Sequence, residues 1–90
     1  MTIEEAKEAF TSQARIVHNC RCSGSLIVYK RIREFKYVTE ANGRKHISLG
    51  LIDDQERCMV WDDPRNVEMY DKSKPLDRDH YFVKNTRQPR

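Results

Sequence analysis

The sequence has no apolar run near the ~18 residues that a membrane-spanning helix needs. Glu4 and Glu5 stand where a signal peptide would carry lysine or arginine. We therefore expect a cytoplasmic protein without a membrane partner. Enzyme motifs are missing too: there is no Gly-x-Ser-x-Gly nucleophile elbow, no phosphate-binding loop and no dinucleotide fingerprint. Since no acid–base pair or nucleophile stands out, we expect no catalytic activity and no cofactor.

Cysteine is scarce, and its three positions exclude a complete disulfide framework because the number is odd. In the cytosol these thiols are expected to be reduced. A zinc site is the less favoured interpretation. His18, Cys20 and Cys22 alternate along one predicted strand, and Cys58 would complete a set of four ligands. The spacing argues against it, because paired zinc ligands usually lie roughly two to four residues apart around a turn.

What the chain does have is charge, sorted by segment. The net charge is −2 over residues 1–14, +6 over 15–45, −5 over 46–71 and +4 over 72–90, which sums to +3. Segregated charge of this kind can present patches of opposite sign, which steer charged partners and fix their orientation. The pattern favours a binding protein over an enzyme.

A single domain is expected from 90 residues. Thr2 and Glu5 form a capping-box pattern, and apolar residues then recur at helical spacing, so a helix is predicted over residues 3–13 with one stripe facing the core. From Arg15 the period changes to two, which predicts strands. The predicted strands are residues 15–20, 26–38, 46–52, 57–61 and 66–70.

Two features of the predicted strands decide the architecture. The strand at 26–38 is too long for a small protein unless it bends, and its mixed faces indicate a bulge that exchanges them. Asn42-Gly43 predicts a tight hairpin of type I′, since both residues tolerate positive φ.

The predicted fold is α+β, with the helix packed on a strongly bent five-stranded antiparallel sheet or SH3-like small barrel. Residues 1–71 would form this domain, and residues 72–90 a basic, flexible tail. Within the tail, Tyr81-Phe82-Val83 could dock back onto the domain or touch a partner.

Four stretches of the chain form a recognisable order of strands and turns. They are Glu8-Ala9-Phe10, Tyr29-Lys30-Arg31-Ile32, Asn42-Gly43-Arg44-Lys45-His46-Ile47-Ser48-Leu49 and Asp63-Pro64-Arg65-Asn66-Val67-Glu68. Together they resemble a group of small uncharacterised proteins of bacterial phages and conjugative elements. The similarity covers about residues 5–69, whereas residues 18–25 and the basic tail depart from it. The resemblance implies a non-catalytic accessory, regulator or inhibitor of host machinery, of which small inhibitors of CRISPR effectors are one class.

A basic and aromatic face is predicted on the long strand. Alternation would place arginines between aromatic rings, which suits single-stranded nucleic acid, because rings stack on bases and guanidinium groups pair with phosphates. The alternative is that the rings belong to the core and the arginines cover a solvated face. The residues are Tyr29, Arg31, Arg33, Phe35 and Tyr37, extended by Arg44 and Lys45 and joined by Trp61 if its strand lies alongside.

An acidic counterpart occupies two predicted turns. These carboxylates could bind a basic groove on a partner protein, or they could be ordinary solvated turn residues. The residues are Asp53, Asp54, Glu56, Asp62 and Asp63.

These patterns leave several functional hypotheses open. The first is a protein partner, namely a nucleic-acid-handling host complex that this protein inhibits or modulates. The alternative is direct binding of single-stranded nucleic acid, which would be sensitive to salt. Binding of a small nucleotide between the helix and the barrel is less favoured. The protein could act as a monomer or as a homodimer paired through an edge strand.

Overall fold

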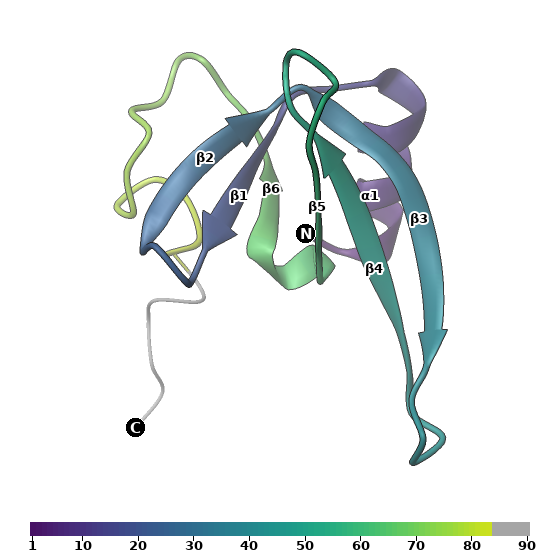
Figure 1. Cartoon of the computed structure of the whole chain (residues 1–90). Helices are drawn as coiled ribbons and strands as arrows, with labels where there is room; N and C mark the ends of the chain where they lie inside the picture. Colours follow the sequence, from purple (N-terminus) through teal and green to yellow (C-terminus); the bar gives the residue numbers. More distant parts are fainter. Residues whose placement is uncertain (84–90) are drawn as a thin grey trace, which may run out of the picture.

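The computed structural model describes residues 1–83 and shows an α+β fold with one N-terminal helix and two small antiparallel sheets (Figure 1). The strand order is β2-β1-β6 in one three-stranded sheet and β3-β4-β5 in the other. The elements are α1 (Ile3–Ser12), β1 (Ile16–Cys20), β2 (Ser25–Tyr29), β3 (Arg31–Thr39), β4 (Lys45–Ile52), β5 (Met59–Asp62), the 3-10 turn η1 (Pro64–Asn66) and β6 (Val67–Met69).

Helix α1 begins at the predicted capping box. The Thr2 hydroxyl accepts from the Glu5 amide at 3.1 Å, and the Glu5 carboxylate accepts from the Thr2 amide at 2.7 Å. The helix ends where Gln13 adopts a left-handed conformation with φ of 56°. Of the residues on its inner face, Ala6 and Ala9 are buried against the sheets. The alanines let the helix approach the strands closely.

The predicted long strand at 26–38 is in fact two strands. β2 ends at Tyr29 and β3 begins at Arg31, and the two belong to different sheets. The chain turns the corner at Lys30, whose amide still donates to the carbonyl oxygen of Ile52 at 2.9 Å. The predicted bend is confirmed, but the single five-stranded sheet is wrong, because this corner divides the strands into two sets of three.

The predicted bulge is also confirmed. The register of β3 against β4 shifts between Ile32 and Glu34, so Arg33 is the extra residue. Ile32 lies opposite Leu51, and after the bulge Phe35 lies opposite Leu49. The inward-facing positions of β3 are therefore three residues apart rather than two.

The hairpin between β3 and β4 lies where Asn42-Gly43 predicts it, but its type is different. Gly43 has a φ of 86°, whereas Asn42 does not have positive φ, so a type I′ turn is excluded. The Gly43 amide donates to Glu40 O at 2.9 Å, and the Glu40 amide donates to Arg44 O at 2.8 Å. This is the longer hairpin loop in which a left-handed glycine closes the turn.

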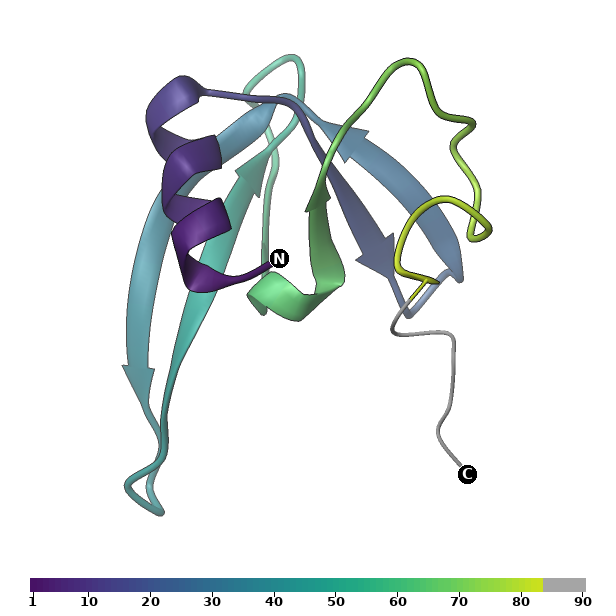
Figure 2. The ribbon, with the colours of Figure 1, turned by 180° about the vertical axis from the view of Figure 1, so that it is seen from behind.

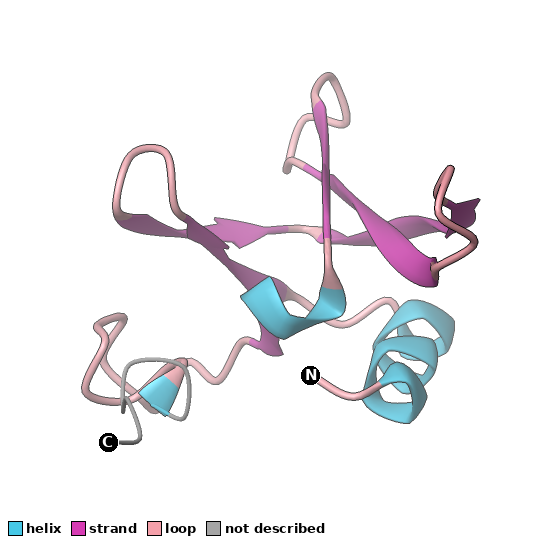
Figure 3. Cartoon of the chain, turned by 90° about the horizontal axis from the view of Figure 1, so that it is seen from below, coloured by secondary structure: helices cyan, strands magenta, loops and turns pink. Residues whose placement is uncertain are grey.

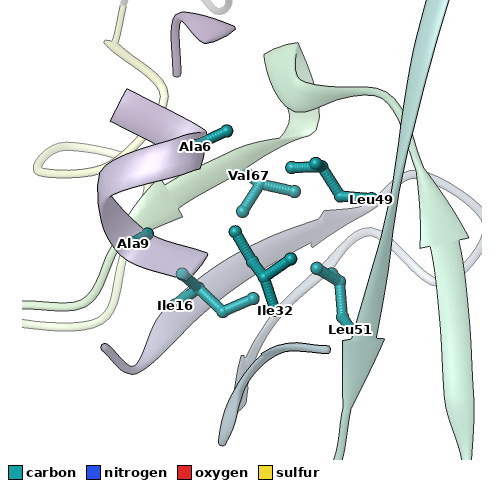
Figure 4. Packing of buried hydrophobic residues seen from close by; sticks show 7 residues of the cluster. All are labelled: Ala6, Ala9, Ile16, Ile32, Leu49, Leu51 and Val67. Carbon is teal, nitrogen blue, oxygen red and sulfur yellow. The ribbon is translucent and has the colours of Figure 1, made fainter. Parts of the chain in front are cut away.

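The main core lies between α1 and the two sheets (Figure 4). Residues from the helix and from strands of both sheets meet there, so burial of apolar surface joins all three parts of the fold. Seen from below, α1 and η1 lie on the same side of the strands (Figure 3). The buried side chains are Ala6, Ala9, Ile16, Ile32, Leu49, Leu51 and Val67.

A second cluster is built by the C-terminal segment, which returns to the far side of β1 (Figure 2). Tyr81 and Phe82 are buried there against Val17. The Tyr81 hydroxyl donates to Asp71 O at 3.0 Å and accepts from the Asp71 amide at 2.9 Å. The prediction that Tyr81-Phe82-Val83 docks back is thus confirmed for its first two residues, and the packed part of the chain continues well beyond residue 71. The rest of the predicted tail, residues 84–90, lies outside the described residues.

Candidate functional site

The outer face of the β3-β4-β5 sheet carries the single tryptophan of the chain, next to a glycine of the neighbouring strand. Trp61 lies opposite Gly50, which has no side chain to lift the indole off the strand. A Cβ atom at Gly50 would meet Trp61 Cη2 at 3.0 Å and Met59 Sδ at 3.0 Å. The Lys36 ammonium lies 4.4 Å from the centre of the indole ring. We call Lys36, Gly50, Met59 and Trp61 the tryptophan platform.

A basic cleft of about 230 Å³ lies between the β3–β4 hairpin and the turn that follows β5. Two of its basic side chains have acidic neighbours, because His46 Nδ1 lies 3.2 Å from Glu40 and Arg65 Nε lies 3.5 Å from Asp63. Arg44 and Lys45, the other two cations of the cleft, are exposed. No ion pair within residues 1–83 involves either of them. The lining residues are Glu40, Arg44, Lys45, His46, Asp63 and Arg65.

The predicted basic-aromatic strand face is not one surface. Tyr29 belongs to β2 and packs on the main core, where burial raises the pKa of its hydroxyl. Phe35 points to the helix side, with its ring 5.2 Å from that of Phe10. Arg31 pairs with Glu56 at 3.6 Å. Placing these residues on one face was wrong, because the corner at Lys30 and the bulge at Arg33 break the alternation.

Other members of that set are exposed, but they do not all lie on the face that carries Trp61, since Tyr37 lies on the same side of β3 as Phe35. Arg33 is exposed at the bulge, and Arg44 and Lys45 are exposed at the hairpin. Tyr37 is 72% exposed. Trp61 does lie in the same sheet as β3, although β4 separates the two strands.

Most of the predicted acidic residues make contacts within the molecule. Asp54 pairs with Arg15 at 2.9 Å, and Glu56 pairs with Lys30 at 2.7 Å. The hydrogen bond and charge of Lys30 lower the pKa of Glu56. These carboxylates therefore hold the corner between the sheets rather than forming an unpaired acidic surface.

Of the three remaining acidic turn residues, Asp62 contacts His18 Nε2 at 2.7 Å, and the other two cap local structure. Asp53 Oδ1 accepts from the amide of Arg57 at 2.8 Å, and Asp63 Oδ1 accepts from the amide of Arg65 at 2.9 Å. Such side-chain bonds to nearby amides are what aspartate commonly provides at turns and 3-10 starts.

The predicted zinc set is not assembled. His18 is 4% exposed and uses Nε2 to contact Asp62 Oδ2 at 2.7 Å, while Cys22 and Cys58 are exposed. Within residues 1–83 there is no group of three or more His, Cys, Asp or Glu side chains placed to hold a metal ion. At Cys20, hydrogen bonds from Ser23 lower the pKa of the thiol.

Sequence reasoning missed the polar cluster of His18, Asp62 and Asn66, which joins the two sheets. Asn66 Nδ2 donates to Asp62 Oδ1 at 3.0 Å, and the His18 ring stands edge-on to Tyr29 at 5.9 Å between centroids. His18 and Asp62 are far apart in the sequence and belong to different sheets. No local pattern could have paired them.

Acid is expected to weaken the protein through Asp62. Burial alone would raise the pKa of this carboxyl, but hydrogen bonds with His18, Asn66 and the Asp63 amide outweigh burial and lower the pKa below its ordinary 3.8. The resulting stabilisation is complete above the unfolded-state pKa and is lost as the pH falls through the lower folded-state pKa. Asp62→Asn should cost about 1–3 kcal/mol at neutral pH and should flatten the acid limb of the stability profile.

Urea unfolding at a series of pH values measures this effect. Asp79→Asn, which changes an exposed carboxyl in the same way, serves as the control and should leave the profile almost unchanged. An unaltered acid limb in Asp62→Asn would contradict the assigned role.

A larger cavity, of about 590 Å³, lies between the start of α1, β6 and the C-terminal segment. It contains both signs of charge, for example Glu68 and Lys74, and both groups already bond to other residues of its lining: Glu68 accepts from the Phe82 amide and Lys74 donates to His80 O. It offers no concentrated anion site for a small nucleotide.

No helix within residues 1–83 has the length and apolar character needed to cross a membrane. No protein-family model, curated protein or solved structure matches this chain.

Proposed function

We propose that this protein binds single-stranded nucleic acid without catalysis, through the tryptophan platform and the basic cleft. The observation that carries the proposal is the half-buried indole of Trp61, whose six-membered ring lies next to Gly50, with the Lys36 ammonium 4.4 Å from the ring centre. Aromatic rings on open sheet faces stack on unpaired bases, and this contact is sequence-tolerant because every base has a π-face.

The basic cleft lies close enough to Trp61 to bind the same nucleic-acid strand. Arg65 in the cleft follows Trp61 by one short turn, so the cleft lies at the end of β5 that bears the platform. A cleft of about 230 Å³ edged by Arg44 and Lys45 is open enough for a phosphate group. A base on Trp61 and a neighbouring phosphate in the cleft would use both sites in one strand.

Removing both unpaired cations of the cleft tests the proposal. Arg44→Ala with Lys45→Ala should weaken binding of a labelled oligothymidylate and reduce the salt slope by about 1.4, because each phosphate that a cation neutralises on a single strand adds about 0.7 to the slope. Fluorescence anisotropy across a salt series measures both quantities, and quenching of Trp61 reports stacking independently.

The matched control removes two exposed lysines elsewhere, Lys7→Ala with Lys72→Ala, which lowers the net charge equally. We expect a much smaller change in the slope. Binding that ignores salt, or equal losses of affinity in the two double variants, would overturn the proposal.

A second candidate is the protein-directed one, in which the chain modulates a nucleic-acid-handling complex. The 72% exposed ring of Tyr37 supports it, since an exposed tyrosine on a projecting hairpin is a typical anchor in protein interfaces. Asp53, Asp54 and Glu56 bond to groups within the molecule. This counts against an acidic surface as the basis of binding to a protein partner. No oligonucleotide binding at any salt concentration, together with stoichiometric capture of a defined complex that Tyr37→Ala abolishes, would favour this function.

A further inference from the structure

The outer edge of β3 is the longest free strand edge in the described part of the chain. β3 has 9 residues and pairs with β4 on one side only, while the other strands at sheet edges, β2, β5 and β6, have 5, 4 and 3 residues. Figures 1 and 2 show β3 as the outermost strand of its sheet, and its half near the hairpin extends beyond α1. An unpaired edge of this length is a template for another strand.

The direction of the free backbone groups follows from the hairpin. The Glu40 amide donates to Arg44 O, and the register from Glu34 to Thr39 is unbroken. Alternation along an antiparallel ladder then points the N–H and C=O groups of Phe35, Tyr37 and Thr39 away from β4. These groups are oriented to bond a further strand.

We propose that a second copy of this chain occupies this edge, with the two β3 strands antiparallel and centred on Phe35. In that register Phe35 bonds its counterpart through both backbone groups. Glu34 of each copy lies directly opposite Lys36 of the other, so the Lys36 side chains would exchange their contacts with Trp61 for two opposite-charge pairs around the symmetry axis. The strand is thus complementary to itself in charge as well as in hydrogen bonding.

Charge distinguishes this register from its neighbours. Centring the pair on Lys36 would place two lysines directly opposite each other, which is destabilising. Centring it on Tyr37 would place Lys36 opposite Val38, without a partner charge. Only the register centred on Phe35 satisfies both the outward backbone groups and the charges.

Apolar side chains beside the edge of β3 also favour a second copy of this chain as the binding partner. Phe10 is 39% exposed and stacks on Phe35, and Tyr37 projects from the same side of the strand. A second copy would cover part of this apolar surface. Pairing about Phe35 also keeps the outer faces of the two sheets on the same side. The two Trp61 platforms would therefore share one surface of a six-stranded sheet. The pairing itself requires no nucleic acid.

Charge reversal at the edge tests the inference by size-exclusion chromatography with light scattering, in the absence of nucleic acid. The wild-type chain of 10.7 kDa should elute at twice that mass. Lys36→Glu replaces both attractive pairs by repulsive ones and should raise the dimer dissociation constant about tenfold or more. Combining it with Glu34→Lys exchanges the two charges and should restore the dimer.

Circular dichroism melts confirm that each variant is folded, and Lys7→Glu on the exposed side of α1 is the matched reversal that should leave the dimer intact. A wild-type monomer at every accessible concentration would overturn the inference. So would a dimer that ignores Lys36→Glu, or one that the double exchange fails to restore. Because no oligonucleotide is present, these outcomes are independent of the proposed nucleic-acid binding.

Discussion

Replacing Phe82 with alanine is expected to lower the free energy of unfolding by about 3–5 kcal/mol. The ring is 1% exposed and packs with Tyr81 against Val17, so the substitution would leave a void under β1. The hydrogen bond from the Phe82 amide to Glu68 would remain, because alanine keeps the donor. The change in stability therefore measures side-chain packing alone. Urea unfolding followed by circular dichroism gives the value.

Leu76→Ala provides the comparison within the same segment. Leu76 is 45% exposed, so its truncation should change stability by no more than about 0.5 kcal/mol. If Phe82→Ala were as mild as this control, the segment after β6 would not be part of the cooperative fold.

Replacing Gly50 with valine is expected to displace the indole of Trp61 and to destroy the tryptophan platform. Any Cβ at this position comes within 3.0 Å of the indole and of Met59, and a β-branched side chain adds two methyl groups in the same space. Overpacking of this kind costs about 1–3 kcal/mol of stability. If the platform stacks on bases, the affinity for an oligonucleotide should fall as well. The expected loss of binding free energy is about 1–3 kcal/mol for one stacked base.

The emission of Trp61, the only tryptophan, reports its displacement directly. Ser25→Val, at an exposed position of β2 in the other sheet, is a suitable control, because it also adds a β-branched side chain but lies outside the sheet that carries Trp61. An unshifted emission spectrum in Gly50→Val would show that the indole does not depend on the glycine.

Local signals predicted the elements well. The capping box at Thr2 and Glu5 located the start of α1, and Asn42-Gly43 located the hairpin, because both features depend on a few neighbouring residues. The bend and the bulge in the stretch 26–38 followed from its excess length and mixed faces. What could not be predicted was the division into two sheets, since the corner at Lys30 carries neither glycine nor proline.

The candidate site was predicted only in part, for a related reason. Arg44 and Lys45 lie at the hairpin and Trp61 on β5, as expected, because each is near a turn or strand whose position could be predicted locally. Tyr29 was misplaced because the corner at Lys30 puts it in the other sheet, and Phe35 because the extra residue at the bulge exchanges the faces of every later position of β3. The acidic residues found partners such as Arg15 and Lys30 across the sheets, and such pairings are properties of the tertiary structure.

The bonds between distant parts of the described chain have a consequence for folding. The Met1 ammonium donates to Pro64 O and Val67 O at 2.8 Å each, across sequence separations of 63 and 66 residues. The side chains that cover Val17 are equally distant in sequence, since they are those of Tyr81 and Phe82. Contacts this distant along the chain slow folding, since a long loop must close before any of them forms. We therefore expect the bonds of Met1 and the cover over β1 to form late in folding, after the local hairpin between β3 and β4, so that Val17 stays exposed until the last contacts are made.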